Sequence, residues 1–116
     1  MIFRNLIDNA IKYADERPSV GIESHPKGEH TIVTRIIDNG RGIPAPLRRK
    51  IFGRFVRLGN ELERSRTGTG LGLFIVRNLV KRLGGQITVR DRVGQPGTIF
   101  EVQLPCRQLE ATSAPV

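Results

Sequence analysis

The sequence predicts an α+β fold: a two-layer sandwich in which helices cover one face of a mixed, mostly antiparallel sheet. Residues 2–14 and 70–83 have apolar side chains at helical spacing. A pair of strand-like segments follows each of these helices, and a short turn separates the members of each pair. The predicted order is therefore helix, strand, strand, a long irregular segment, helix, strand and strand.

Length and composition fit one small domain, expected at residues 1–105, with a polar, frayed tail at 106–116. The chain has 116 residues, of which 38% are hydrophobic and 26% charged. Its single cysteine, Cys106, excludes an internal disulfide and suits a reducing compartment. We find no apolar run long enough to span a bilayer and no signal peptide, so a cytoplasmic location is expected.

The charge of the chain is strongly basic. The formal net charge is +8, and arginine is concentrated between residues 41 and 66. This balance favours polyanionic partners such as nucleic acid, a membrane surface or nucleotide phosphates. The five Phe, one Tyr and absent Trp argue against stacked recognition of many bases. A solvated basic loop explains the charge equally well.

The first predicted helix, residues 2–14, has a polar side as well as an apolar one. Asn5, Asn9 and Lys12 fall into one narrow stripe of that side. An Asn side-chain oxygen can be a ligand of Mg2+, and Lys12, one turn further on, can meet a phosphate as a point charge. For this helix alone, an exposed polar face is the simpler explanation.

Strands are predicted at residues 20–24 and 31–37, and the second leads into the sequence DNGRGIP. Asp38 follows that strand directly, so it can be held rigidly at the edge of a pocket. A carboxylate there can accept a hydrogen bond from an amine such as adenine N6. Gly40 and Gly42 would let a flat ring approach the backbone. For this motif alone, a plain Asp-Asn-Gly turn is the better explanation.

Residues 44–67 have no sustained period, except for a short helix expected around PLRRKIF. An irregular segment of this length in a small domain is usually functional, such as a lid. The second helix, 70–83, follows it and ends at Gly84-Gly85, as expected for a C-terminal cap. Strands are then predicted at 86–90 and 98–104.

The second helix opens within the glycine-rich sequence RTGTGLGLFIVRNLV. The spacing of Gly68, Gly70 and Gly72 fits neither the dinucleotide-binding fingerprint nor a P-loop. Backbone amides at a helix N-terminus nevertheless favour anions, and the absence of side chains lets phosphate oxygens come close. A flexible loop that enters a helix explains this stretch equally well.

Taken together, the motifs resemble one known family. NLIDNAIKYA, DNGRGIP, IFGRFVR and GTGLGL are similar, in order and spacing, to the N, G1, F and G2 boxes of the ATP-binding catalytic domain of sensor histidine kinases. The wider group includes gyrase B, Hsp90 and MutL. The resemblance covers nearly the whole chain except the tail. It implies ATP and Mg2+ as cofactors and a protein histidine kinase of two-component signal transduction.

The resemblance also implies partners and residue roles. The γ-phosphoryl group would pass to a histidine on a separate dimerisation domain and from there to a response regulator, with no nucleic acid involved and a membrane only through the parent protein. Asn9 would hold Mg2+ with support from Asn5, Lys12 would contact phosphate, and Arg57 would reach the phosphates from the mobile lid. The implied contacts of the nucleotide are Asn9, Lys12, Tyr13, Asp38, Gly40, Gly42, Ile43, Gly68, Thr69, Gly70, Leu71 and Gly72.

Asn5 separates the kinases from their ATP-hydrolysing relatives. Those relatives have a Glu at this position, which takes a proton from the attacking water, and an amide cannot act as a general base at neutral pH. Asn5 therefore favours transfer to another nucleophile. An ATP-hydrolysing or ATP-gated member of the group is the alternative, and a basic nucleic-acid-binding module is an alternative of another class.

The resemblance also implies a role for the F-box residues: Phe52 and Phe55 would anchor the lid.

The chain departs from the family pattern at its beginning. It starts at the N box, whereas the family domain normally has a strand and the start of the helix before it. We therefore expect an N-terminally truncated domain, and a fragment that no longer binds nucleotide is a further alternative. His25 and His30 flank a turn without an H-[ED]-x-x-x-P sequence, so neither is expected to be the phosphoacceptor.

Overall fold

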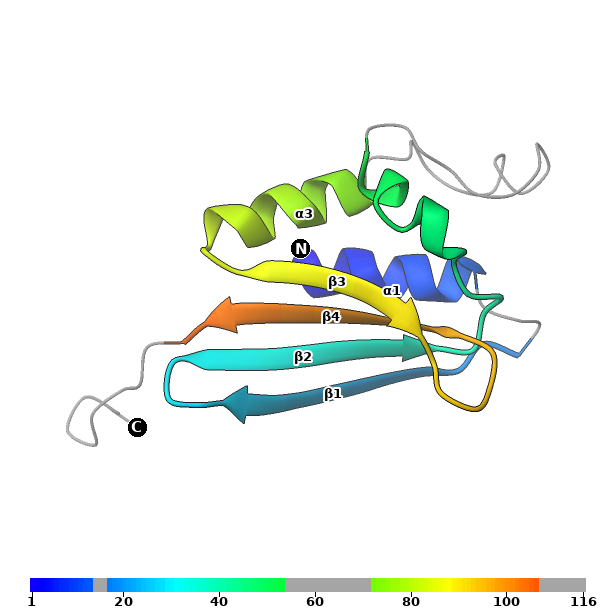
Figure 1. Cartoon of the computed structure of the whole chain (residues 1–116), viewed down its shortest axis with the longest axis horizontal. Coiled ribbons are helices and arrows are strands. Elements are labelled where there is room, and N and C mark those ends of the chain that lie inside the picture. Colours follow the sequence, from blue (N-terminus) through cyan, green and yellow to red (C-terminus); the bar gives the residue numbers. More distant parts are fainter. Residues whose placement is uncertain (14–16, 54–71, 107–116) are drawn as a thin grey trace.

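The computed structural model describes residues 1–13, 17–53 and 72–106, and it confirms the two-layer α+β architecture. Two α-helices lie on one face of a four-stranded sheet (Figure 1). The α-helices are α1 (Ile2–Tyr13) and α3 (Gly72–Arg82). The strands are β1 (Val20–Lys27), β2 (Thr31–Asp38), β3 (Gln86–Asp91) and β4 (Thr98–Pro105). Two 3-10 helices follow β2: η1 (Ala45–Leu47) and η2 (Lys50–Phe52).

The sheet has the strand order β1-β2-β4-β3, and all three pairings within the described residues are antiparallel. Each predicted hairpin is present, and the pairing of β2 with β4 joins the two hairpins. In this central pairing Ile36 lies opposite Phe100, and Asp38 lies opposite Thr98. The register therefore brings the end of the DNGRGIP strand against the beginning of β4.

The hydrophobic core lies between the helices and the sheet. Ile36 and Phe100 are fully buried, and both belong to the core cluster that includes residues of α1 and α3. They are cross-strand partners, so their side chains share the helix side of the sheet. The buried residues of the helices that complete this core are Leu6, Ala10, Val76 and Val80. Phe52 of η2 packs edge-on against Phe100, with a ring-centroid distance of 6.3 Å. This contact ties the start of the irregular segment to the centre of the sheet.

Gly84 and Gly85 end α3 as the sequence predicts. Gly84 has a φ of +79°, and its N–H donates to the Lys81 carbonyl, while the Gly85 N–H donates to the Val80 carbonyl at 2.9 Å. These bonds form a Schellman motif. A Cβ on Gly85 would collide with the Gln103 carbonyl, so glycine is also required where the chain enters β3.

Several predicted features lie outside the described residues. They are the lid segment with Phe55 and Arg57, the glycine motif from Gly68 to Leu71, and the tail from residue 107 onward. At the described end of the chain, the Cys106 N–H donates to the His30 carbonyl at 2.7 Å. Neither α1 nor α3 is long and apolar enough to cross a membrane.

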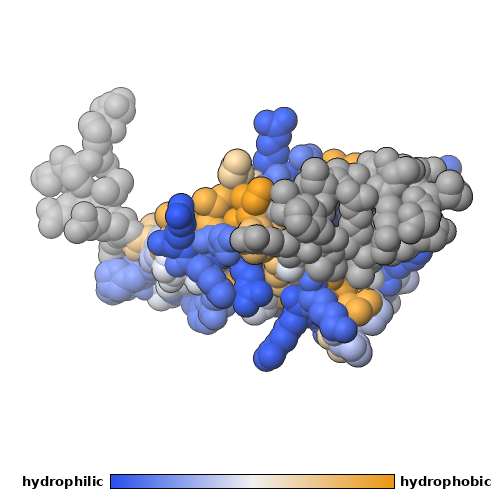
Figure 2. Space-filling model, turned by 90° about the horizontal axis from the view of Figure 1, so that it is seen from above, coloured by the Kyte–Doolittle hydropathy of each residue, from blue (hydrophilic) through white to orange (hydrophobic). Residues whose placement is uncertain are grey.

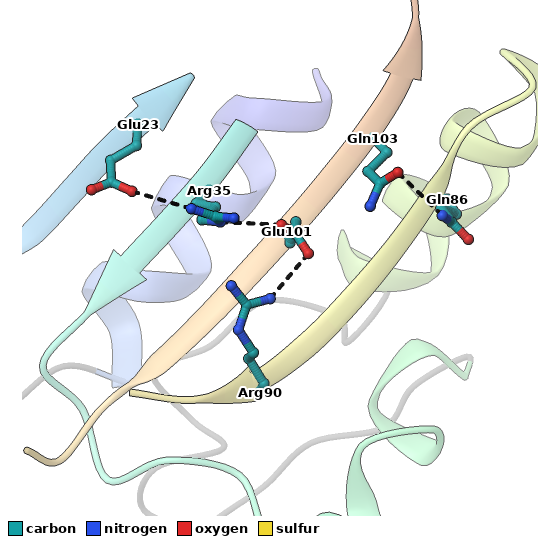
Figure 3. Close-up of polar contacts among 6 residues, drawn as sticks. All are labelled: Glu23, Arg35, Gln86, Arg90, Glu101 and Gln103. Atoms are coloured by element: carbon teal, nitrogen blue, oxygen red, sulfur yellow. Dashed lines mark hydrogen bonds and ion pairs between the residues drawn. The ribbon is translucent and has the colours of Figure 1, made fainter. Parts of the chain in front are cut away.

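The two outer faces of the sandwich differ in character. Figure 2 shows the helix side, where apolar surface is visible among polar and charged side chains; Leu83, just after α3, is one exposed apolar residue. The opposite face of the sheet carries a cluster of charged and polar side chains beside apolar ones such as Val33 and Ile37. There the Glu101 carboxylate of β4 accepts from Arg35 Nε of β2 at 3.1 Å and from Arg90 Nη1 of β3 at 3.0 Å (Figure 3). Glu101 thus joins three strands through their side chains.

The charge of Glu101 is stabilised by its neighbours. Burial alone would raise its pKa, but the hydrogen bonds and positive charges of Arg90 and Arg35 outweigh burial and lower the pKa. A carboxylate whose pKa is lower in the folded state contributes stability above its unfolded pKa, and this contribution is lost as the pH falls through the folded pKa.

Glu101→Gln is therefore expected to lower the free energy of unfolding by about 1 kcal/mol at neutral pH, because Arg35 and Arg90 both lose the Glu101 carboxylate. The difference from wild type should shrink as the pH falls through the folded-state pKa of Glu101, which lies below its usual range. Urea unfolding at neutral pH and at a series of lower pH values measures this. Glu23→Gln is the matched control, since the Glu23 side chain is 57% exposed and 3.8 Å from Arg35, and it should change stability much less. Equal effects of the two variants would contradict the assignment.

Candidate functional site

The described members of the predicted site come together at one end of the sandwich. The C-terminal end of α1, the end of β2, both 3-10 helices and the beginning of α3 lie at the same end of the molecule, on the right in Figure 1. Asn9 and Lys12 belong to α1, Asp38 ends β2, and Gly72 is the first residue of α3. The fold therefore gathers three motifs that are far apart in the sequence.

Asp38 is the most buried charged group at this end among the described residues. Its side chain points to the helix side, like that of Ile36, and the residue is only 4% exposed. One carboxylate oxygen, Oδ1, accepts from the Gly40 N–H at 2.8 Å, and the backbone N–H of Thr98 also hydrogen-bonds the carboxylate. These amides fix the carboxylate at the edge of the core.

Burial raises the pKa of Asp38, although the Gly40 and Thr98 amides and the charge of Arg92 oppose this effect. A raised folded-state pKa means that the ionised carboxylate costs folding free energy: the stabilising effect of protonation is present at low pH and is lost as the pH rises through the folded pKa. The protein therefore keeps a buried carboxylate whose ionised form costs folding free energy. Such groups are typical of functional sites.

Thr98 is a site residue that our sequence reasoning missed. It is 4% exposed and lies directly across from Asp38 on β4. The signal available in the sequence was the strand alternation, which puts Thr98 on the same inward face as Phe100 and Val102. Only the strand register shows which residue lies opposite it.

The turn between β3 and β4 packs tightly against the backbone of Asp38. Gly97 has a φ of +139°, and a Cβ built there would collide with the Asp38 carbonyl oxygen and with the Arg92 side chain. Arg92 Nη1 donates to the same carbonyl at 3.4 Å, and the Arg92 N–H donates to the Gly97 carbonyl at 3.3 Å. The turn is thus in close contact with the backbone carbonyl of Asp38.

The DNGRGIP sequence is more than a simple turn. The Asn39 side chain joins the end of β2 to the segment before β1: its Oδ1 accepts from the Ser19 N–H at 3.0 Å, and its Nδ2 donates to the Arg17 carbonyl at 2.8 Å. Gly42 has a φ of +84°, which favours glycine, and Ile43 packs against the hydrophobic core. The backbone beside Asp38 therefore has a defined path with little side-chain bulk.

The polar stripe of α1 runs toward the same end of the molecule. Asn5 and Asn9 are half-buried, and Lys12 is exposed in the last turn of the helix, which Tyr13 ends. Among residues 1–13, 17–53 and 72–106 no three His, Cys, Asp or Glu side chains are grouped as metal ligands. An amide oxygen of Asn9 fits the other common arrangement, in which Mg2+ takes few protein ligands and completes its shell with phosphate and water oxygens.

A family comparison agrees with these features. The family model described as "Histidine kinase-, DNA gyrase B-, and HSP90-like ATPase" matches residues 1–108. Among curated relatives, the chain is 37% identical over 118 residues to the sensor histidine kinase AruS of Pseudomonas aeruginosa, covering 98% of this chain and 12% of AruS. It is 39% identical over 111 residues to the sensor protein kinase WalK of Staphylococcus aureus, covering 94% of this chain and 26% of WalK. The chain thus spans only a minor part of these relatives.

Two solved structures of similar fold are of histidine kinases as well. The mycobacterial sensor histidine kinase MprB has a TM-score of 0.80 and 32% identity, covering 93% of this chain and 70% of that chain. Full-length ShkA in complex with AMPPNP has a TM-score of 0.78 and 29% identity, covering 95% of this chain and 22% of that one. The similarity therefore extends over almost all of this chain.

The close packing of Gly97 yields a test of the site's architecture. Gly97→Ala is expected to lower the free energy of unfolding by about 3 kcal/mol, because the new methyl group meets the Asp38 carbonyl and the backbone is strained as well. Gly94→Ala is the matched control: Gly94 also has a positive φ, of +78°, but a Cβ there meets open space. Its expected cost is about 1 kcal/mol, from backbone strain alone. Denaturant unfolding compares the two, and equal losses would contradict the tight contact.

Proposed function

The chain belongs to the family of histidine kinase-, DNA gyrase B- and HSP90-like ATPases, and we propose that it is the catalytic ATP-binding part of a two-component sensor histidine kinase that transfers the γ-phosphoryl group of ATP to a histidine on a separate dimerisation domain. The observation that carries this proposal is Asp38, a buried carboxylate fixed by two backbone amides at the end of a central strand. It is supported by the histidine kinases among the relatives.

Asp38 is proposed to recognise the base. Its ionised carboxylate accepts a hydrogen bond from the amino group of adenine, and a site built on that bond rejects bases without a donor at this position. Gly40, Gly42 and Ile43 would form the wall beside the ring, and Tyr13 would pack near the base or ribose. The positive φ of Gly42 and the apolar packing of Ile43 support this assignment.

The phosphates are proposed to lie between α1 and the start of α3. Asn9 would hold Mg2+ with support from Asn5, and Lys12 would contact a phosphate. The glycine motif would supply backbone amides, and the lid would supply one guanidinium group. The residues concerned are Gly68, Thr69, Gly70, Leu71 and Gly72 for the amides and Arg57 for the guanidinium. Of these, only Gly72 lies within the described residues. Bound Mg2+ would offset negative charge on the phosphates, and the protein would contribute positioning and electrostatic stabilisation. The AMPPNP bound to the neighbouring ShkA structure supports a nucleotide ligand of this kind.

The acceptor of the phosphoryl group is proposed to lie outside this chain. His25 and His30 are exposed in β1 and in the turn that follows it, away from the site end of the sheet. The chain corresponds to 12% of AruS and 26% of WalK, which leaves room in such proteins for an acceptor domain. A response regulator would then receive the phosphoryl group, and this part of the parent protein would work in the cytoplasm.

Asn5 favours a kinase over an ATP-hydrolysing enzyme, because an amide does not take a proton from water at neutral pH. The two activities differ in a simple assay. Phosphate release from ATP without any acceptor should be slow, whereas transfer should appear when a histidine-bearing dimerisation domain is added. Brisk release without an acceptor would favour the hydrolase.

Asp38→Asn tests the base assignment. Calorimetric titration with ADP should show an affinity lower by about 100-fold or more, because an amide can present its NH2 group to the adenine donor. Wild-type affinity should fall in acid as the carboxylate is protonated. Because burial raises the pKa of Asp38, this loss should begin at a higher pH than for an exposed aspartate. Glu23→Gln, on the open face, is the control, and unchanged ADP binding by Asp38→Asn would refute the assignment.

Asn9→Ala tests the metal assignment. The affinity for an ATP analogue should no longer rise when Mg2+ is added, because the amide oxygen that would bind the ion is gone. Binding of the analogue without Mg2+ and the thermal unfolding midpoint should stay close to wild type. Asn78→Ala, at an exposed position of α3, is the matched control and should keep the full effect of Mg2+. A normal response of Asn9→Ala to Mg2+ would place the ion elsewhere.

A further inference from the structure

Arg48 connects two segments beside the site through one side chain. Its Nε donates to the Ile43 carbonyl at 3.0 Å, and its Nη2 lies 2.9 Å from Asp91 Oδ1 at the end of β3. The two bonds use different nitrogens of one planar guanidinium group, so they fix its orientation as well as its position. The sequence analysis placed Arg48 only in the expected short helix PLRRKIF and in the arginine-rich region, without a role at the site.

The segment that Arg48 holds has no regular secondary structure of its own. Residues 41–44 belong to neither a helix nor a strand, and they run between the end of β2 and η1. Gly42, within this segment, lies close to the same Asp91: a Cβ built on it would be 3.6 Å from Asp91 Oδ1 and 3.6 Å from the Gly97 carbonyl oxygen. Arg48 therefore links this backbone to the end of β3. The β3–β4 turn that follows packs against Asp38.

Two simpler roles for Arg48 make different predictions. As an ordinary surface ion pair with Asp91, Arg48 would contribute little to stability or to binding. The Asp91 side chain is 66% exposed, and exposed ion pairs are weak. As a phosphate contact it would act through its charge alone. Neither role requires the second contact of Arg48, the hydrogen bond from its Nε to the Ile43 carbonyl.

We propose that Arg48 is a positioning residue of the base site: it holds the Gly42–Ile43 backbone against the end of β3 at the distance that an adenine ring requires. This inference rests on the proposed function, in which that backbone forms the wall beside the base. Asp91 serves as the anchor for Arg48. A small displacement of such a wall weakens binding without removing any direct contact to the ligand.

The test compares Arg48→Gln with Arg49→Gln, which removes the same charge from the neighbouring exposed position. ADP affinity of Arg48→Gln should fall about tenfold, while the affinity for tripolyphosphate, which has no base, should stay within about twofold. Arg49→Gln should leave both within about twofold. Arg48→Lys should fail to restore ADP binding, because one ammonium group does not reproduce the two-pronged contact.

Asp91→Asn is the second variant, since Asp91 is exposed and its substitution disturbs folding least. We expect it to weaken ADP binding in the same direction, and the double variant with Arg48→Gln to be no weaker than Arg48→Gln alone, because both act through one contact. In the nucleotide-free protein, amide hydrogen exchange at Gly42 and Ile43 should be faster in Arg48→Gln than in wild type.

The outcomes separate the inference from the function on which it rests. Equal ADP affinities and equal exchange rates in the Arg48 and Arg49 variants would overturn the positioning role while leaving ATP binding intact. Parallel losses for ADP and tripolyphosphate would overturn it in favour of a phosphate contact. A wild-type chain that binds no adenine nucleotide would overturn the proposed function, and faster exchange at Gly42 would then show only a structural clamp.

Discussion

The antiparallel pairing of β2 with β4 is the constraint on which the rest of the structure depends. It joins two hairpins that are distant in the sequence, and it sets Ile36 against Phe100 in the core. The same register sets Asp38 against Thr98 two residues further along. Because the register of a strand decides the face of every side chain, the core and the candidate site are fixed by one choice. A slip of one residue would expose the core and move the carboxylate to the open face.

The candidate site is an extension of the core rather than an addition to the surface. Asp38 is held by backbone amides, by a glycine turn that excludes any side chain, and by strands whose positions the core determines. The carboxylate is thus positioned by the fold itself before any ligand binds, which favours selective binding. It also costs stability, because a buried charge is kept where burial raises its pKa. The function proposed for Asp38 and the stability of the fold therefore make opposite demands on this one residue.

The β3–β4 hairpin forms ion pairs on both faces of the sheet. Arg90 points to the open face and pairs with Glu101, whereas Asp91, the next residue, points to the helix side and pairs with Arg48. The first ion pair joins strands, and the second reaches the irregular segment after β2. The end of this hairpin can therefore keep the turn at Gly97 in contact with Asp38. Because side chains alternate along β3, Arg90 can pair with another strand on the open face while Asp91 contacts the segment beside the candidate site.

The sequence by itself determined the order of the elements and most of the candidate site. Periodicity located α1, α3 and the four strands of the described residues, since apolar spacing follows the local geometry of each element. Each motif alone had a plainer explanation, and only the resemblance of all of them together to one family indicated a single nucleotide site. Only the tertiary structure decided which strands are neighbours, that Thr98 lies opposite Asp38, and that Arg48 reaches both Ile43 and Asp91. Those relations depend on strand register and on packing between distant segments, which local patterns do not contain.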